Sequence, residues 1–312
     1  MRSSIRAQRG VALVLVLWVS ILLTVIASSF IVERRAETLI VRNSVSLARA
    51  AAAADAGVQR ALLDAFRSDN ATDLWRRDGQ SHDWTFDGVP VRVEMRDESA
   101  KIDVNTASDP LLRGLLLSVG VPEEEATRIL DAILDWRDPD TLKRANGAEE
   151  ADYRAAGLTY RPANSPFLAI EEIQLVLGMR PDIYRRIAPM ITVYSRQTGV
   201  NAAFATREVL LAIPGVTPQI VDEYIQRRSE ALAAGQPPPV FPQGLPFAGG
   251  SAMITNVRAE ARLDDGTYFA REAVALLRSA PRKPVTFVVW RESTAPPAGA
   301  ADPAAQPQEA AR

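Results

Sequence analysis

The 312-residue sequence predicts an α+β fold: a long N-terminal helix, an antiparallel sheet, and a large all-helical insertion between the strands. Three observations carry this prediction. An uncharged apolar run opens the chain and passes into an alanine-rich amphipathic stretch without a break signal. Alternating, strand-like segments occur near residue 90 and again after residue 250. Between them, apolar residues recur at helical spacing.

The first element is the uncharged run from Val11 to Val32, 22 residues long. As a helix it would span roughly 33 Å, which matches a hydrocarbon core of about 30 Å. Arg2, Arg6 and Arg9 precede the run, and fewer positive charges follow it. The excess of positive charge before the run predicts a single-pass inner-membrane protein with a cytoplasmic N-terminus and an exported, periplasmic remainder.

The helix is expected to continue beyond the membrane surface as one element of about 55 residues, because apolar residues follow at spacings of three and four. An ordinary anchor with a separate juxtamembrane helix is the alternative. The residues of this predicted apolar face are Leu47, Ala51, Ala54, Val58, Leu62 and Phe66.

Strands are expected on both sides of the insertion. The segment Thr85–Met95 alternates and contains Asp87-Gly88, which predicts a first strand pair with a tight turn. Three further strands are expected after residue 250, and Asp265-Gly266 is expected in the turn between the first two of them. These three strands are predicted at Ala252–Arg262, Thr267–Leu277 and Pro284–Arg291.

The insertion contains the scheme helix, Gly-Val, helix twice, at Gly120-Val121 and at Gly215-Val216. Both copies resemble helix-hairpin-helix units, some of which bind DNA through backbone amides. Copy one carries three glutamates, 123–125, where a phosphate would lie, and the net charge of −2 gives little attraction for nucleic acid. We therefore expect packing units and no nucleic-acid partner, with a membrane-tethered DNA receptor as the alternative function.

Composition excludes several classes of site. The chain has no cysteine and one histidine, His82, so disulfides, thiolate metal sites and multi-histidine sites are ruled out. His82 lies in a polar stretch and is expected in a solvated loop. No phosphate-binding loop or nucleophile elbow occurs. The sequence therefore predicts that the protein is not an enzyme.

The segment Gln8-Arg9-Gly10-Val11 resembles a type IV prepilin leader, which a dedicated peptidase cuts between Gly10 and Val11. Glycine would give that peptidase unhindered, non-helical backbone. Most pilins carry a glutamate at the fifth mature position, where this chain has Leu15. With the segments Asn105–Ser108 and Asp135–Asp140, the chain resembles the K class of minor pseudopilins of bacterial type II secretion systems.

The resemblance implies a non-enzymatic structural subunit at the tip of the secretion pseudopilus, which starts or caps the fibre and supports protein export across the outer membrane. The inserted domain would block another subunit from stacking above it. The implied partners are the I, J and H classes of minor pseudopilin, the major pseudopilin, the prepilin peptidase and the inner membrane, with methylation at the new N-terminus. A minor pilin of a true type IV pilus is the second alternative.

The resemblance also implies calcium binding in the acidic segment of the inserted domain. Clustered carboxylates suit a hard cation that takes about six to eight oxygen ligands. A solvated acidic loop in which Asp135 caps a helix or pairs with an arginine is the alternative. The candidate ligands are Asp138, Asp140, Glu149, Glu150 and Asp152.

A capped amphipathic helix is expected over residues 164–179, ending at Gly178, and a disordered tail is expected after residue 292. The predicted division of the chain is a leader at 1–10, a transmembrane helix at 11–32, the exported half of the helix at 33–68, the first part of the sheet domain at 69–104, the inserted α-domain at 105–235, the second part of the sheet domain at 236–292, and the tail at 293–312.

Overall fold

The computed structural model describes residues 9–67, 74–242, 253–278 and 282–293, with the backbone alone for residues 9–12 and 30–36. The predicted leader lies outside the described residues except for its last two positions, and the predicted tail does so except for Ser293.

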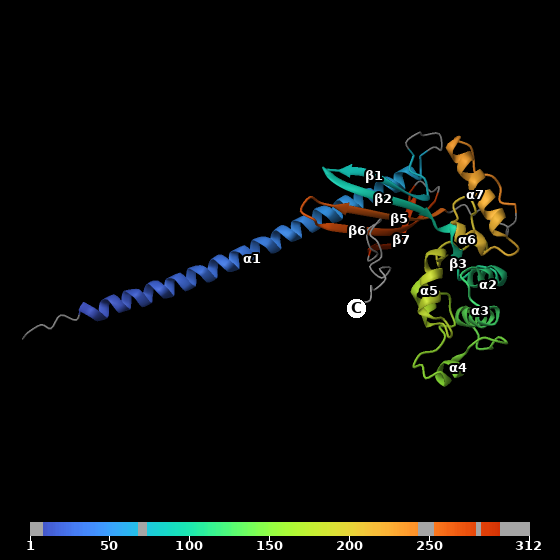
Figure 1. The fold of residues 1–312 in the computed structure, drawn as a ribbon, viewed down its shortest axis with the longest axis horizontal. Coiled ribbons are helices and arrows are strands. Elements are labelled where there is room, and N and C mark those ends of the chain that lie inside the picture. Colours follow the sequence, from blue (N-terminus) through green and yellow to red (C-terminus); the bar gives the residue numbers. More distant parts are fainter. Residues whose placement is uncertain (1–8, 68–73, 243–252, 279–281, 294–312) are drawn as a thin grey trace, which may run out of the picture.

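One helix, α1 (Arg9–Asp64), runs for 56 residues and projects far from a globular head (Figure 1). The continuous element is confirmed over the alternative of a separate juxtamembrane helix. Because the helix begins at Arg9, Gly10 and Val11 lie in its first turn. A first helical turn lacks most of its internal hydrogen bonds, so glycine is tolerated in it at little cost.

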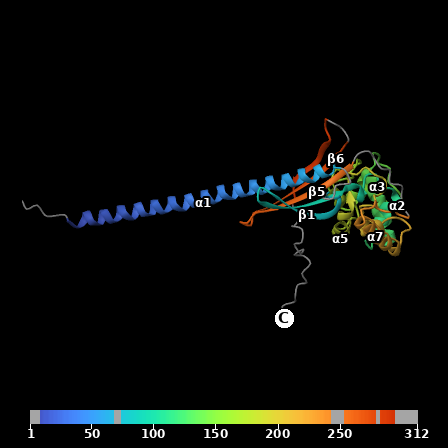
Figure 2. The same ribbon diagram turned by 90° about the horizontal axis from the view of Figure 1, so that it is seen from above.

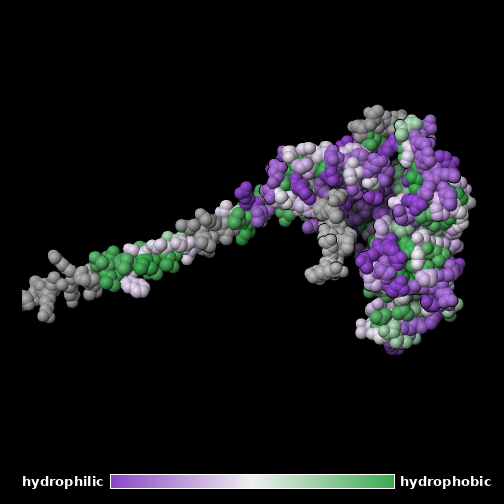
Figure 3. All heavy atoms as spheres, viewed as in Figure 1, coloured by the Kyte–Doolittle hydropathy of each residue, from purple (hydrophilic) through white to green (hydrophobic). Residues whose placement is uncertain are grey.

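Across the residues that the structure describes, no helix is long and apolar enough to cross a membrane. The outer part of α1 nevertheless exposes large apolar side chains, seen as the green stretch in Figure 3. Leu13, Trp18 and Leu23 are each more than half exposed.

The last third of α1 covers one face of a five-stranded antiparallel sheet with the order β1-β2-β5-β6-β7 (Figure 2). The three strands expected after residue 250 are confirmed, and so is the turn at Asp265-Gly266. The strands are β1 (Asp78–Phe86), β2 (Val89–Asp97), β5 (Met253–Arg262), β6 (Tyr268–Leu277) and β7 (Val285–Glu292).

The contact between α1 and the sheet is made of small residues. A Cβ atom on Gly57 would lie 2.9 Å from Cγ1 of Val91, so the backbone of the helix approaches the sheet closely. The prediction of this face is confirmed at its centre, where Ala54 and Val58 are buried. Its two ends, Leu47 and Phe66, are nearly half exposed, because the neighbouring alanines lie against the sheet instead. Among the described residues of α1, the buried ones are Ala50, Ala53, Ala54, Gly57, Val58, Ala61, Leu62 and Asp64.

Strand β1 begins at Asp78, seven residues before the predicted strand pair. His82 therefore lies in a strand and not in a solvated loop. Its ring stacks on Trp75 with centroids 5.2 Å apart. Polar residues on the outward face of this edge strand hide its alternation in the sequence, and the ring stack supplies the burial that the sequence does not signal.

The α-domain lies beyond the far end of the sheet, on the side away from the projecting part of α1 (Figure 1). It contains helices α2 (Asp109–Ser118), α3 (Glu123–Arg137), α4 (Glu150–Ala155), α5 (Pro181–Ile187), α6 (Arg207–Leu211) and α7 (Pro218–Ala233), with short 3₁₀ turns η1 (Glu98–Ala100), η2 (Ile170–Leu175) and η3 (Ala188–Met190). Two two-residue strands, β3 (Ile102–Asp103) and β4 (Ile191–Thr192), pair in parallel where the domain begins.

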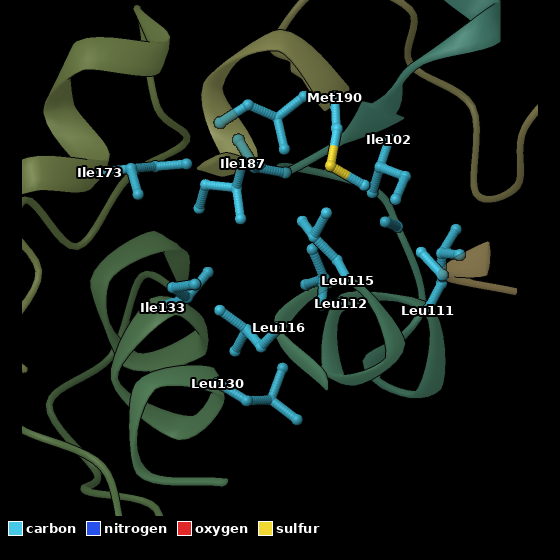
Figure 4. Close-up of a cluster of buried hydrophobic side chains, with 14 of the residues drawn as sticks. Ile102, Leu111, Leu112, Leu115, Leu116, Leu130, Ile133, Ile173, Ile187 and Met190 are labelled. Carbon is cyan, nitrogen blue, oxygen red and sulfur yellow. The ribbon is translucent and has the colours of Figure 1, made fainter. Parts of the chain in front are cut away.

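The α-domain has its own apolar core, separate from the core between α1 and the sheet. Leu112 and Leu116 of α2 point into this core together with Ile133 of α3 and Ile187 of α5 (Figure 4). The α2–α3 and α6–α7 pairs each join through a glycine turn, and their identity as helix-hairpin-helix units stays a prediction.

The prediction of a helix over residues 164–179 is wrong, because only the six-residue 3₁₀ turn η2 forms there. Asn105 accounts for part of this difference. Its side chain donates from Nδ2 to the carbonyl oxygen of Phe167 at 3.0 Å and accepts from the Phe167 amide at 2.8 Å. This pair of bonds from a distant residue holds the start of the segment outside a helix.

Candidate metal centre and interaction surfaces

The acidic loop between α3 and α4 is organised by one buried carboxylate, Asp135. Its two oxygens accept from the backbone amide of Arg144 at 3.2 and 3.3 Å. Gly147 packs directly against it, because a Cβ atom there would lie 1.9 Å from Oδ2 of Asp135. Asp135 therefore holds the loop from inside, and only glycine fits beside it.

Three of the five candidate ligands, Asp138, Asp140 and Glu149, lie near enough to repel one another electrostatically. Burial raises the pKa of Asp138, and the charge of Asp140 raises it further. Burial also raises the pKa of Glu149, followed by the charges of Asp135, Asp138 and Asp140. Oδ1 of Asp138 and Oε1 of Glu149 are buried and accept no hydrogen bond from the described residues. The loop thus contains negative charge that its own donors do not neutralise.

The other two candidates already have partners. Lys143 donates to Oδ1 of Asp152 at 2.6 Å, and the Glu149 amide donates to Oδ2 of the same residue at 2.9 Å. Both hydrogen bonds lower the pKa of Asp152, and the bond from Lys143 has the larger effect. Glu150 turns to Arg154, 2.5 Å away, and to Arg161 at 3.5 Å. The structure therefore sets Glu150 apart from the remaining four.

Within the described ranges, no three acidic or histidine side chains lie close enough together to hold a metal ion. The donor set is nevertheless of the right kind for calcium, because two buried carboxylate oxygens lack partners. Backbone carbonyls and water commonly complete such a site. On this test Asp138 and Glu149 fit a calcium ion best.

The sequence prediction missed the residues that shape the loop, which are Lys143, Arg144 and Gly147. A signal was present for two of them. Lys143 and Arg144 are the only cations between Asp138 and Asp152, so one of them pairing with a carboxylate could have been expected. Nothing in the sequence places Gly147 against Asp135.

A second buried carboxylate, Asp103, fixes the start of the α-domain. It accepts from the Arg196 amide at 2.7 Å, the Asn105 amide at 2.9 Å and Oγ of Ser195 at 3.3 Å. The pKa of Asp103 is raised above its ordinary value, because the effect of burial exceeds the opposing effect of these hydrogen bonds. Because Asp103 also belongs to β3, the short parallel pair and this network together join residues 102–105 to residues 191–196.

A second candidate interaction surface lies on α1 just before the helix reaches the sheet. Leu39, Ile40, Val41 and Val45 are each more than half exposed there. Exposed apolar side chains in consecutive turns of an ordered helix are typical of a surface that packs on another protein.

Comparison with known proteins gives one consistent family. A sequence model described as "Type II secretion system (T2SS), protein K" matches residues 95–196, which include the end of β2 and the acidic loop. The chain is 30% identical over 214 residues to the type II secretion system protein K of Aeromonas hydrophila, covering 60% of this chain and 64% of that protein. It is 27% identical over 246 residues to the Pseudomonas aeruginosa protein, covering 70% of this chain and 72% of that one.

The fold agrees with these sequence matches. A solved structure, "The Crystal Structure of the GspK-GspI-GspJ complex from enterotoxigenic Escherichia coli Type 2 Secretion System", contains a chain that superposes with a TM-score of 0.59 at 13% identity. The superposition covers 84% of this chain and 100% of that chain. The matches to the proteins of Aeromonas hydrophila and Pectobacterium carotovorum span 64% and 62% of those proteins, less than two thirds of their length.

Proposed function

We propose, from the premise that this chain belongs to the type II secretion system protein K family, that it is the subunit at the tip of the secretion pseudopilus. Members of this family are structural pseudopilins and not enzymes. In this role the chain starts or caps the fibre together with the I, J and H minor pseudopilins and the major pseudopilin. The fibre then supports protein export across the outer membrane.

One observation carries the proposal: the α-domain extends beyond the sheet, opposite to the direction in which α1 projects (Figure 1). Pseudopilins above would have to occupy the space that this domain fills. The exposed apolar residues of α1 leave the opposite side free to pack on later subunits. Another subunit can therefore pack on the side where α1 projects, but not on the opposite side, which the α-domain occupies.

Labelling at a single cysteine tests this position. The chain has no cysteine of its own, and Leu168 is 81% exposed on the α-domain, so Leu168→Cys can carry a maleimide-gold label on isolated fibres. We expect one label at one end of each fibre, while a cysteine in the major subunit should mark the whole shaft as the control. Labels from Leu168→Cys spaced along the shaft would overturn the tip assignment.

We also propose that the start of α1 anchors the protein in the inner membrane after removal of the leader by the prepilin peptidase. The uncharged run from Val11 to Val32 and the exposed apolar side chains within it support this. Intact-mass measurement with and without the peptidase tests it. The expected product starts at Val11 and carries an added N-terminal methyl group, whereas a start at Met1 in both samples would contradict the proposal.

Calcium is the third part of the proposal. Asp138 and Glu149 would hold the ion in the acidic loop, and its charge would neutralise a cluster whose members now repel one another. Binding would stabilise the α-domain because the ion favours the folded loop.

Thermal unfolding of the full chain in detergent, with calcium and with a chelator, tests the site. Calcium should raise the unfolding midpoint in the wild type and not in Asp138→Asn or Glu149→Gln. Glu150→Gln is the matched control, because Glu150 pairs with Arg154 and should leave the response intact. An equal response in all four proteins would place the ion elsewhere or exclude it.

A further inference from the structure

Strand β7 is an open edge of the sheet and carries exposed apolar side chains. It is the last strand in the order β1-β2-β5-β6-β7, so among the residues that the structure describes no strand neighbours its outer side. Phe287, Val288 and Trp290 are between 38% and 51% exposed, and the rings of Phe287 and Trp290 pack edge to face at 4.8 Å. A long apolar edge strand of this kind is a template for pairing with another chain.

The backbone groups on the open side can be assigned from the register. Glu292 lies opposite Arg271, and the amide of Ser293 donates to Ala270 at 2.8 Å. In an antiparallel pair, alternate residues bond to the same neighbour. Trp290 and Glu292 therefore direct their N–H and C=O groups away from β6, to the open side.

The opposite edge, β1, differs from β7 in the side chains that it exposes. The register shifts once along each edge pair, between Asp78 and Ser81 in β1 and opposite Val274 and Ala275 in β7. Each edge also carries one ion pair to its neighbouring strand, Asp83 with Arg92 and Arg291 with Glu272. The exposed positions of β1 are mainly polar, whereas three of those on β7 are large and apolar. Exposed apolar side chains on an edge strand favour pairing with another chain, so β7 is the edge better suited to it.

Positive charge collects where β7 begins. Arg278 follows the last residue of β6, Leu277, and Arg282 and Lys283 precede β7 with only Pro284 between. All three are exposed, and none forms an ion pair with another described residue. The edge thus exposes apolar side chains between Phe287 and Trp290 and is basic at the end nearest Val285, which defines the chemistry of a complementary segment.

We propose that β7 accepts an extended segment of a neighbouring pseudopilin as a sixth strand. That segment has apolar residues at alternate positions, which cover Phe287 and Trp290, and acidic residues at the end that meets Arg282 and Lys283. Backbone bonds to Trp290 and Glu292 supply affinity, and the charges set the direction of the segment. The inference rests on the proposed function, since it names the surface by which a partner subunit binds.

Binding of the I- and J-class subunits of the same organism to the full chain in detergent tests the edge. Val288→Lys places a charge on it, and Arg282→Glu with Lys283→Glu reverses its basic end. Each variant should weaken binding of one partner by about tenfold or more. Replacing the acidic residues of the partner segment by basic ones should restore binding to the variant that combines Arg282→Glu with Lys283→Glu. Thr85→Lys, on the exposed face of β1, is the matched control and should bind as the wild type does.

Hydrogen exchange on the same complexes distinguishes strand addition from other packing. The amides of Trp290 and Glu292 should become protected when the partner binds. Unchanged exchange at these amides, or unchanged affinity in variants whose unfolding midpoints match the wild type, would overturn the inference and leave the proposed function standing. Failure of the wild type to bind either subunit would instead contradict the proposed function and the inference with it.

Discussion

Arg271 of β6 joins the sheet to the long helix by pairing with Asp55 of α1, with Nε and Oδ1 2.6 Å apart. Its guanidinium also lies over the rings of Phe269 and Trp290, at 4.9 and 5.2 Å from their centroids. One side chain therefore links α1, β6 and β7. The pair is only partly exposed on the arginine side, so solvent weakens it less than it weakens a surface pair.

Arg271→Gln should destabilise the docking of helix and sheet by about 1–2 kcal/mol, because it removes an ion pair and two cation–π contacts. Denaturant unfolding of the full chain measures this loss. Arg92→Gln is the control, since Arg92 pairs with Asp83 on the open surface and should cost less than about 0.5 kcal/mol. Equal losses in the two variants would contradict the special role of Arg271.

Asp64, at the end of α1, should make stability depend on pH. Burial by itself raises its pKa, but hydrogen bonds from Arg60, Arg67 and the Trp75 amide lower it by more, to below the ordinary value of 3.8. A lowered pKa means that the unfolded chain binds the proton more readily. The stabilisation is therefore present above pH 3.8 and is lost as the pH falls through the lower, folded-state pKa.

The difference in unfolding free energy between the wild type and Asp64→Asn isolates this contribution. We expect roughly 2 kcal/mol near neutral pH, shrinking as the pH falls below about 4. Asp83→Asn serves as a comparison, because Asp83 is exposed. A difference for Asp64→Asn that stays constant from pH 7 to pH 2 would show that its charge does not contribute.

Gly147→Ala should disrupt the acidic loop, because the new methyl group would overlap the carboxylate of Asp135. Overpacking of this kind costs about 1–3 kcal/mol. We expect a lower unfolding midpoint for the α-domain and faster exchange at the Arg144 amide, which bonds to Asp135. Ala145→Ser, at an exposed position two residues away, should change neither. A Gly147→Ala protein with unchanged exchange would refute the packing argument.

Lys143 should compete with a bound cation, because it already donates to Asp152 in the loop. Removing this charge in Lys143→Gln should tighten calcium binding by roughly three- to tenfold, as measured by calorimetry. Lys101→Gln removes a lysine paired with Glu98 outside the acidic loop and should leave the affinity unchanged. Weaker binding in Lys143→Gln would mean that the lysine orders the site instead of opposing the ion.

Periodic segments of the sequence predicted their own structure well. The continuous helix and the strands β5 to β7 follow from patterns that are local, and the structure confirms them. Segments whose conformation depends on distant contacts were not predictable. The start of residues 164–179 is held extended by Asn105, 62 residues away from Phe167, and His82 gains its place through a ring stack on Trp75.

The acidic loop shows the same limit at the level of a site. The sequence shows which carboxylates are close along the chain, and three of the other candidates lie near enough to Glu149 to raise its pKa. It did not indicate that Lys143 would pair with Asp152, or that Asp135 would be buried beneath Gly147. Those facts depend on the direction in which the loop closes, and helical or strand periodicity contains no information about it.

The small residues between α1 and the sheet have a consequence for how the helix is aligned along its own axis. Alanine and glycine present a nearly smooth surface, so apolar packing alone specifies the axial register weakly. Polar contacts supply what the packing lacks. Ser46 donates to Asp265 at 2.7 Å, Arg49 donates to the carbonyl of Asp87 at 3.0 Å, and Asp55 binds Arg271. These contacts are spread over about 13 Å of helix, so a slip of one turn would break all three at once.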